Sequence, residues 1–370
     1  MPRTMKAAVV ESVGAPFAVT ELTIDDPIGQ EVLVEVRASG LCHSDLHIAT
    51  QDYGYPMPIV LGHELAGVVV AVGDAVTSVR VGDHVVGSLI QFCGRCTTCL
   101  RGLTHQCRNG ASLVRDPSLP PRLSRDGASV FPGMGLGAFA EFSLVHEHQL
   151  VVVPDALPLP AACLLGCGVI TGMGAALNSS PVRPGESIAI IGVGGVGLSA
   201  VAGARLAGAE TIIAVDLNPR ALELAGRFGA THTVDAREAD AVAAVLELVP
   251  EGVDHAFEVV GTPATTYQGM AMLRLGGTIS LIALHAPGSA IELVDIFPNY
   301  IMRQMTIRAV NMGSTNLRRD IPLYARLALD GRLDLGALVA REIDLGEVDA
   351  AYAALGSGQV ARSVITSFAG

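Results

Sequence analysis

Residues 187–216 read SIAIIGVGGVGLSAVAGARLAGAETIIAVD, and this stretch decides the fold that we expect for the chain. Ser187–Ile191 and Thr211–Val215 are short apolar runs without a polar face, which is typical of parallel strands covered on both sides. The glycine places of the pattern G-x-G-x-x-G between these two runs are filled by Gly192, Gly194 and Gly197. The sequence therefore predicts a strand, a glycine turn, a helix and a second strand.

A turn of this kind binds the pyrophosphate of a dinucleotide. Its glycines permit a tight turn, a close approach of the backbone to the ligand and close packing of helix on strand, and the helix N-terminus favours an anion. Gly195 and Val196 complete the turn, and Asp216 follows Gly197 by 19 residues, near the usual spacing for a carboxylate that binds the adenosine ribose. Such a carboxylate repels a 2′-phosphate, so the sequence predicts NAD rather than NADP, although Arg220 lies close enough to weaken that preference.

Length and composition limit the classes of function. The chain has 370 residues, half of them apolar, which suits two packed domains. Its formal net charge is −12 and it has no basic cluster, which argues against nucleic acid and anionic membranes as partners and favours small molecules. No apolar run approaches a membrane span of about 18 residues and no signal peptide is recognisable, so we expect a cytoplasmic protein.

The pattern of elements changes along the chain. Residues 1–150 carry short β-like runs separated by glycine-rich turns, such as 31–38, 66–72 and 84–87. Residues 170–310 alternate strands and helices, with helices expected over 198–206 and 220–228 and strands over 212–216 and 278–283. A helix over 320–329 and a last strand over 363–368 follow, and this tail can return to the first domain. The predicted fold class is α/β, a β-rich domain joined to a doubly wound domain.

Four of the seven cysteines lie in one loop with the spacing C-x2-C-x2-C-x7-C: Cys93, Cys96, Cys99 and Cys107. Four thiolates on one loop can close a tetrahedral shell around a structural zinc ion, whose binding energy is also folding energy for the loop. An iron–sulfur cluster or four reduced thiols are the alternatives.

A second set of candidate ligands is spread along the chain: Cys42 in GLCHSDLH, His63 and Glu64 in LGHELAG, and Cys167 in LLGCGVITG. Taken singly, each has an ordinary explanation as a buried core residue. Taken together, two cysteines and one histidine form the shell that leaves zinc an open fourth position for water or substrate.

These motifs, in this order and followed by GVGGVG and Asp216, resemble the zinc-dependent medium-chain alcohol dehydrogenases over essentially the full length, and the long loop after Cys107 is similar to that of the class I and class III branch. The resemblance implies a GroES-like catalytic domain over 1–168 and 310–370, with the structural zinc lobe at 93–107. It also implies a Rossmann NAD-binding domain over 169–309, with the active site in the cleft between the two domains.

The resemblance assigns roles position by position. It makes Cys42, His63 and Cys167 the ligands of a catalytic zinc ion, with Glu64 as an alternative ligand. It makes Asp45 the carboxylate that orients the liganding imidazole, Ser44 the hydroxyl that binds the substrate oxygen, and His47 the base at the outer end of a proton relay. Asp45 can alternatively cap the start of a helix. The cofactor contacts that the resemblance implies, besides the glycine turn, are His43, Thr171 and Arg362. At His43 many members of the family have arginine.

The implied function is hydride transfer between a primary or secondary alcohol and NAD, with two zinc ions in each chain. One alternative is oxidation of the adduct of formaldehyde with a thiol, as in class III, although His47 replaces the tyrosine typical of the glutathione-dependent branch. Another is a non-catalytic NAD-binding protein on the same scaffold. By the same analogy we expect a homodimer, with the apolar stretch Ile282–Leu284 as the edge strand that pairs across a two-fold axis.

Overall fold

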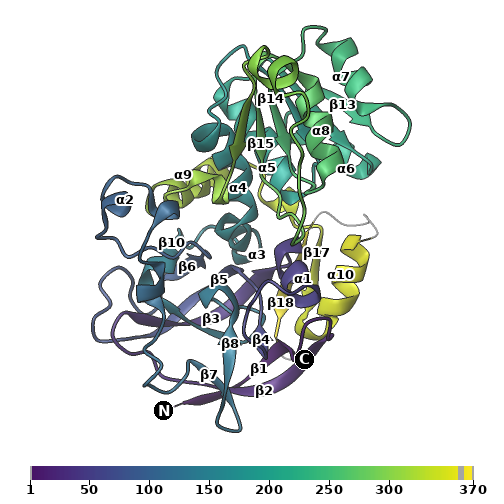
Figure 1. Cartoon of the computed structure of the whole chain (residues 1–370). Coiled ribbons are helices and arrows are strands. Elements are labelled where there is room, and N and C mark those ends of the chain that lie inside the picture. The colour runs from purple at the N-terminus through teal and green to yellow at the C-terminus, as the bar shows by residue number, and fades with distance from the viewer. Residues whose placement is uncertain (1, 357–361, 369–370) are drawn as a thin grey trace. The chain divides into compact units, whose positions relative to one another are not determined.

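The computed structural model describes residues 2–356 and 362–368, and the chain divides into two compact units (Figure 1). The first unit consists of Met1–Gly168 together with Asn316–Gly370, and the second of Val169–Thr315. The predicted C-terminal domain segment 310–370 includes residues 357–361 and 369–370, which lie outside the described residues.

The first unit contains a closed barrel with the strand order β1-β2-β7-β8-β4. Its strands are β1 (Arg3–Val10), β2 (Phe17–Ile24), β4 (Ile59–Val60), β7 (Leu123–Arg125) and β8 (Ala128–Pro132). Large apolar side chains from β1 and β2, such as Met5, Val9 and Ile24, are at most 1% exposed and pack in one cluster with Phe139. This cluster fixes the barrel against the loops that follow it.

A seven-stranded sheet lies in the same unit, in the order β10-β6-β5-β3-β18-β17, with β9 paired to β3. Its strands are β3 (Glu31–Gly40), β5 (Glu64–Val72), β6 (His84–Gly87), β9 (Phe142–His146), β10 (Leu150–Val152), β17 (Arg341–Asp344) and β18 (Ser363–Ser367). β18 pairs antiparallel with the end of β3, so the tail of the chain returns to the first unit. The helices of this unit are α1 (His43–Thr50), α2 (Thr97–Leu100), α3 (Leu159–Ala162), α9 (Leu317–Leu329) and α10 (Val348–Gly356).

The second unit is built on a six-stranded sheet in the order β13-β12-β11-β14-β15-β16, in which every pairing is parallel. Its strands are β11 (Ser187–Ile191), β12 (Thr211–Asp216), β13 (His232–Asp235), β14 (Val253–Glu258), β15 (Leu273–Leu281) and β16 (Thr306–Ala309). Its helices are α4 (Gly168–Gly174), α5 (Gly195–Ala207), α6 (Pro219–Phe228), α7 (Ala241–Leu248) and α8 (Pro263–Met272). The order of strands reverses between β11 and β14, and ligands of such sheets bind at this switch point.

Most of the predicted elements are present, with small shifts at their ends. β11 and β6 have the predicted bounds, whereas α5 begins at Gly195 rather than Leu198 because the last residues of the glycine turn already form the first helical turn. The prediction of an edge strand at Ile282–Leu284 is wrong. β15 ends at Leu281, and the edge of the sheet is β16, which pairs with β15 on its outer side.

Among the described residues, no single helix is long and apolar enough to cross a membrane. One bent pair of helical segments, 159–166 with 168–179, has the length and composition of a membrane span, and nothing beyond these two properties supports a span there.

Candidate metal centres and dinucleotide site

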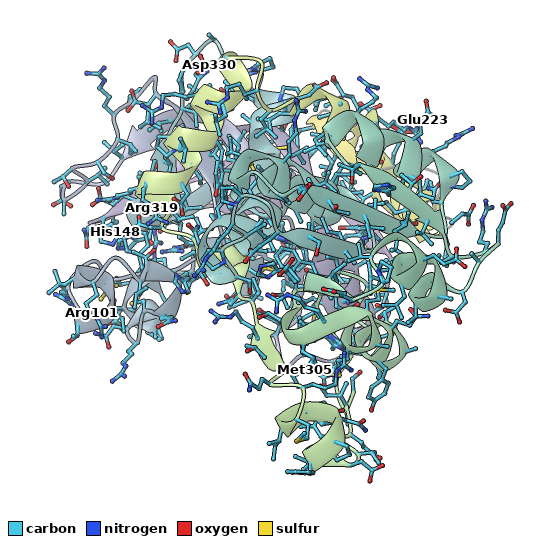
Figure 2. The ribbon with its side chains drawn as sticks, turned by 90° about the horizontal axis from the view of Figure 1, so that it is seen from above. Arg101, His148, Glu223, Met305, Arg319 and Asp330 are labelled. Atoms are coloured by element: carbon cyan, nitrogen blue, oxygen red, sulfur yellow. The ribbon has the colours of Figure 1, made fainter. Side chains whose placement is uncertain are left out.

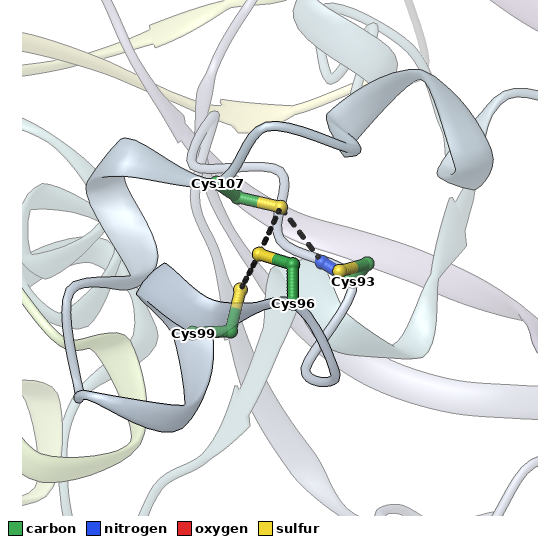
Figure 3. Close-up of side chains that lie close together, drawn as sticks. All are labelled: Cys93, Cys96, Cys99 and Cys107. Carbon is green, nitrogen blue, oxygen red and sulfur yellow. Dashed lines mark hydrogen bonds between the residues drawn. The ribbon is translucent and has the colours of Figure 1, made fainter.

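The four cysteines of the predicted zinc lobe converge from one loop (Figure 3). Their sulfur atoms all lie within 4.8 Å of one another, with Cys96 Sγ 3.4 Å from Cys99 Sγ and 3.9 Å from Cys107 Sγ. The backbone N–H of Cys93 also donates to Cys107 Sγ at 3.2 Å. The loop reverses through the four-residue helix α2 and a short turn, which carries the last two ligands back towards the first two.

The environment of Cys96 favours the charged form that metals bind. A hydrogen bond with the Thr98 hydroxyl, and further ones from the backbone N–H groups of Cys99 and Arg108, lower the pKa of Cys96 to about 5. A thiol with this pKa is ionised at neutral pH. Four sulfur donors in a group of this size fit a closed tetrahedral zinc site.

A second group of donor atoms lies in the first unit. Cys42 directly precedes α1, His63 directly precedes β5, and Cys167 lies just before α4. Their ligating atoms lie within 4.8 Å of one another and all three residues are buried, and His63 Nε2 is 3.2 Å from Cys167 Sγ. The structure therefore gathers the three residues that the sequence could group only by resemblance. Two sulfur atoms and one nitrogen fit zinc with a position left open.

Asp45 fixes the ring of His63. Its Oδ1 atom lies 2.9 Å from His63 Nδ1 and accepts a hydrogen bond from the Gly62 backbone N–H at 3.0 Å, and the carboxylate is fully buried. With Nδ1 engaged in this way, Nε2 is left to face the sulfur of Cys167. This is the arrangement by which a carboxylate orients a liganding imidazole.

Glu64 and Arg362 form a buried ion pair beside this group. Glu64 Oε1 accepts from Arg362 Nη2 at 3.0 Å and from the Gly168 backbone N–H at 3.1 Å, while its Oε2 atom is buried with no hydrogen-bond partner among the described residues. Burial raises the pKa of Glu64 to about 7, against the opposing effect of the Arg362 guanidinium.

Arg362 also donates to the Leu41 carbonyl at 2.8 Å and is 4% exposed. The sequence assigned this arginine to the cofactor, and that contact stays a prediction. The contacts of Arg362 with Glu64 and Leu41 were not predicted. No local pattern could have indicated them, because these partners lie 298 and 321 positions away in the chain.

Helix α1 carries the remaining candidates of the first unit. Ser44 Oγ lies 3.8 Å from Cys42 Sγ, and His47 follows one turn later. His47 is half-buried, and its Nδ1 atom is buried without a hydrogen-bond partner among the described residues. His43, the first residue of the helix, is exposed.

The glycine turn of the second unit joins β11 to α5 at the switch point of the sheet. Gly192 has a φ of +89°, which glycine adopts without strain, and its N–H donates to the Val215 carbonyl at 2.9 Å. A Cβ atom at Gly197 would collide with the Gly192 carbonyl, so close packing of the helix requires glycine there. At Gly194, by contrast, a Cβ atom would meet no atom within 4 Å, so the space in front of the helix N-terminus is open. The turn therefore fits a pyrophosphate.

Asp216 lies at the end of β12, where its carboxylate meets the glycine turn. Its Oδ2 atom accepts from the Val193 N–H at 2.7 Å, and its Oδ1 atom accepts from the Asn218 N–H at 2.9 Å. Arg220 is exposed in the first turn of α6. Thr171 is buried in α4, where its hydroxyl lies 3.7 Å from Met312 Sδ. The structure therefore brings Asp216 to the predicted turn.

Two family models match separate parts of the chain. Residues 29–155 match the model of the alcohol dehydrogenase GroES-like domain, and residues 195–329 match that of the zinc-binding dehydrogenases. The chain is 39% identical over 364 residues to putative alcohol dehydrogenase D of Mycobacterium tuberculosis, covering 97% of this chain and 98% of that protein. It is 38% identical to the NDMA-dependent alcohol dehydrogenase of Amycolatopsis methanolica, with the same shares covered. It is 34% identical to the S-(hydroxymethyl)glutathione dehydrogenase of Synechocystis sp., covering 97% and 99%.

Two solved structures are similar over nearly the whole chain. An alcohol dehydrogenase zinc-binding domain protein from Burkholderia ambifaria superposes with a TM-score of 0.93 at 38% identity and covers 100% of both chains. The benzyl alcohol dehydrogenase of Acinetobacter calcoaceticus superposes with a TM-score of 0.91 at 34% identity, covering 99% and 100%. The predicted family and fold class are thus confirmed, and the chain belongs to the zinc-dependent medium-chain alcohol dehydrogenases, with a GroES-like domain and a Rossmann domain.

Proposed function

We propose that this enzyme transfers hydride between a primary or secondary alcohol and NAD. The observation that carries the proposal is the buried group of Cys42, His63 and Cys167, with a carboxylate behind the histidine and a hydroxyl and an imidazole on the adjoining helix. A protein that only binds NAD needs neither an open metal position nor a hydroxyl beside it. This argues against the non-catalytic alternative.

Cys42, His63 and Cys167 would hold the catalytic zinc ion, and Cys93, Cys96, Cys99 and Cys107 the structural one. A zinc ion bound by three protein ligands acts as a Lewis acid that lowers the pKa of a hydroxyl at its open position. The Glu64 Oε2 atom is buried and has no hydrogen-bond partner among the described residues, which supports the role of Glu64 as an alternative ligand.

The side chains of α1 would handle the proton. Ser44 Oγ would accept the proton of the substrate hydroxyl as it passes its own proton outward, and the His47 imidazole would take up a proton at the outer end of the relay. Asp45 keeps the His63 ring in place throughout, because its Oδ1 atom holds Nδ1. Two observations support this role of His47: its side chain is half-buried, and its Nδ1 atom has no hydrogen-bond partner in the part of the chain that the structure describes.

The Rossmann unit would hold NAD through the turn Gly192–Gly197, with Gly195 and Val196 supplying N–H groups at the start of α5. Asp216 would bind the adenosine ribose and exclude a 2′-phosphate. His43, Thr171, Arg220 and Arg362 remain predicted cofactor contacts.

The substrate is tested by following NADH formation with the zinc-loaded enzyme, NAD and a panel of short, long, secondary and aromatic alcohols. Formaldehyde with glutathione or another thiol forms a second set of assays, because relatives of 34–35% identity are S-(hydroxymethyl)glutathione dehydrogenases. Turnover of free alcohols supports the proposal. Turnover of the formaldehyde–thiol adduct alone moves the assignment to the thiol-dependent reaction, and no turnover in any assay contradicts both.

We also propose a homodimer formed through β16 and the segment before it. All four residues of β16 are exposed at the edge of the sheet, and exposed apolar side chains precede it around the short π-helix Phe297–Ile301: Leu293, Val294, Ile296, Phe297, Ile301 and Met302. Figure 2 shows Met305 where the chain leaves this projecting segment. An exposed edge strand beside apolar side chains favours pairing with a second copy.

Light scattering after size-exclusion chromatography tests the dimer. The parent should have twice the mass of the chain, and Ile301→Asp should have the mass of one chain. The control is Leu248→Asp, at an exposed site on α7, and it should have the mass of the parent. A parent protein with the mass of one chain contradicts the dimer.

A reducing compartment, the cytoplasm, is the location that we propose, because the seven cysteines are all unpaired and two groups of them are arranged as metal ligands. Cell fractionation tests this location. Recovery of the protein outside the cytoplasmic fraction contradicts it.

A further inference from the structure

A tyrosine from the C-terminal part of the chain reaches the backbone of a candidate zinc ligand. The Tyr352 hydroxyl donates to the Cys42 carbonyl at 3.1 Å, across 310 positions in the sequence, and this contact is buried. Tyr352 lies in α10 and is 3% exposed. Neither the sequence motifs nor the family models assign it a role.

The ring of Tyr352 belongs to the buried apolar cluster of the first unit. It stacks on the ring of Phe17 in β2, with centroids 5.5 Å apart and an interplanar angle of 25°, and Phe17 in turn meets the edge of Phe139 at 5.9 Å. The Phe17 backbone N–H donates to Asp349 Oδ1 at 3.2 Å, which ties β2 to the first turn of α10. The hydroxyl therefore approaches Cys42 from a position fixed by packing on both a strand and a helix.

The Cys42 carbonyl sits at the point where α1 begins. Cys42 itself is extended, with φ −111° and ψ 146°, and its carbonyl accepts from the backbone N–H groups of Asp45 at 3.1 Å and Leu46 at 3.4 Å. Tyr352 supplies a side-chain donor to the same oxygen. The orientation of this peptide group sets the direction in which the Cys42 side chain leaves the backbone, because Cβ and the carbonyl carbon share one Cα.

The preceding residue is held by the same part of the chain. The Leu41 carbonyl accepts from Arg362 Nη1 at 2.8 Å, and the Leu41 N–H donates to the Ser363 carbonyl at 3.0 Å. Two consecutive carbonyls, those of Leu41 and Cys42, are therefore each bound by a side chain from the C-terminal segment. The C-terminal segment thus fixes the backbone at Leu41 and Cys42.

We propose that Tyr352 is a positioning residue, which orients Cys42 for the catalytic zinc ion through the hydrogen bond to its carbonyl. This inference rests on the proposed role of Cys42 as a zinc ligand. Outer partners of metal ligands typically contribute 10- to 100-fold to metal affinity. Because Tyr352 acts on the ligand backbone and shares the carbonyl with two N–H groups, we expect its hydroxyl to contribute about 3- to 10-fold.

The test compares Tyr352→Phe with Tyr324→Phe in the full-length protein loaded with zinc. Tyr324 is an equally buried tyrosine in α9, 1% exposed, and its hydroxyl makes no hydrogen bond to the candidate ligand segments among the described residues. Both variants remove the hydroxyl of a buried tyrosine and keep the ring. Transfer of zinc to a chromophoric chelator is measured for each, and Cys167→Ser identifies which zinc belongs to the Cys42 site because it removes one ligand of that site alone.

The expected result is that Tyr352→Phe lowers the affinity of the Cys42 site for zinc by about 3- to 10-fold, while Tyr324→Phe leaves it unchanged. With Co²⁺ in place of zinc, the absorption bands of thiolate and cobalt should shift in Tyr352→Phe only, which a general loss of stability would not cause. Equal zinc affinities and equal cobalt spectra in the two variants would overturn the role of Tyr352. If Cys167→Ser retains both zinc ions with parental affinity, the failure lies in the assignment of the metal site itself.

Discussion

His63 and Asp45 show how one residue determines what another can do. An isolated imidazole presents two nitrogen atoms, and either can carry the proton. Here His63 Nδ1 and the Gly62 N–H share one carboxylate oxygen, Oδ1 of Asp45, and both side chains are shielded from solvent. The chemistry of His63 is thereby restricted to Nε2, which lies next to Cys167.

His47 provides a test of the proton relay at the residue scale. We expect His47→Gln to slow alcohol oxidation at neutral pH by about 10- to 100-fold, because general acid–base groups contribute about 10²- to 10⁴-fold and solvent replaces part of the loss. Added imidazole buffer should restore part of the rate. The measurement is the steady-state rate against pH and against buffer concentration, with His232→Gln, an exposed histidine of the second unit, as control. An unchanged rate–pH profile would remove His47 from the relay.

Asp216 provides a second test, for the choice of cofactor. In Asp216→Ser we expect the ratio of kcat/KM for NADP to that for NAD to rise at least about 10-fold, because the repulsion of the 2′-phosphate disappears while Arg220 remains to attract it. Part of the effect should be a higher KM for NAD, since the carboxylate also holds the glycine turn through the Val193 N–H. The matched control is Asp235→Ser at the end of the neighbouring strand β13. An unaltered NADP to NAD ratio would contradict the ribose contact.

At the scale of elements, the four-cysteine loop has little structure of its own to keep it folded. It contains one four-residue helix, α2, and a three-residue turn, and only two of its four cysteines are buried. At the base of the loop, Phe92 is stacked by His148 at 5.1 Å on one side and lies 5.7 Å from the Arg318 guanidinium. Packing therefore fixes where the loop starts, while the metal would fix its interior.

We therefore expect removal of zinc by a chelator to open this loop first. Trypsin should then cut at Arg95, Arg101 or Arg108, all within or next to the loop, before it cuts elsewhere. Mass spectrometry of the first fragments identifies the cleavage sites, and zinc added back before the protease should prevent the cleavage. Cys99→Ser should be cut at the same arginines even with zinc present. Early cleavage at other sites in the metal-free protein would show that the loop folds without metal.

The edge strand of the six-stranded sheet could not be identified from its sequence. β16 was missed as the edge strand because its sequence, TIRA, carries no clear strand pattern, whereas the more apolar Ile282–Leu284 does. An apolar run reports that residues avoid water, but it does not report which strand ends a sheet. That order depends on how the whole chain is threaded through the sheet.

At the scale of the whole molecule, several loops of the first unit are joined by one carboxylate. Glu147 is 1% exposed and lies in the turn between β9 and β10. Its Oε2 atom accepts from the backbone N–H groups of Thr77 at 3.0 Å and Ser78 at 2.8 Å and from the Ser78 hydroxyl at 2.6 Å, and its Oε1 atom accepts from Gln30 at 3.0 Å. Burial alone would raise the pKa of Glu147, but these donors lower it from 4.5 to about 2.

This shift links stability to pH. Since the folded-state pKa of Glu147 lies below the unfolded value, its contribution is complete above pH 4.5 and is lost as the pH falls towards 2. At 1.36 kcal/mol for each pKa unit, the contribution at neutral pH is about 3 kcal/mol. We expect Glu147→Gln to lower the free energy of unfolding by about that amount at pH 7, and the difference from the parent to shrink between pH 4.5 and 2.

Urea unfolding of parent and variant at a series of pH values measures this difference. Glu223→Gln on the exposed face of α6, where Figure 2 labels the residue, is the control and should match the parent at every pH. A Glu147→Gln variant whose difference from the parent stays constant from pH 7 to pH 3 would contradict the linkage.

The sequence by itself determined those features that depend on neighbours along the chain. The strand, glycine turn and helix of residues 187–216 follow from local spacing, because Gly192 supplies the positive φ of the turn and Gly197 leaves room for the Gly192 carbonyl. The same holds for Cys93–Cys107, whose four ligands lie on one short loop. The grouping of Cys42, His63 and Cys167 was available only through resemblance to a family, since no spacing rule connects them.

Only the tertiary structure decided which distant residues meet. Cys167 lies 104 positions from His63, Arg362 lies 298 from Glu64, and Tyr352 lies 310 from Cys42, yet each pair is in contact. The contacts of Arg362 and Tyr352 exist because β18 pairs with β3 and α10 packs into the same apolar cluster as β1 and β2. Pairing of strands and burial of apolar surface across the whole chain set them, and no stretch of sequence contains that information alone.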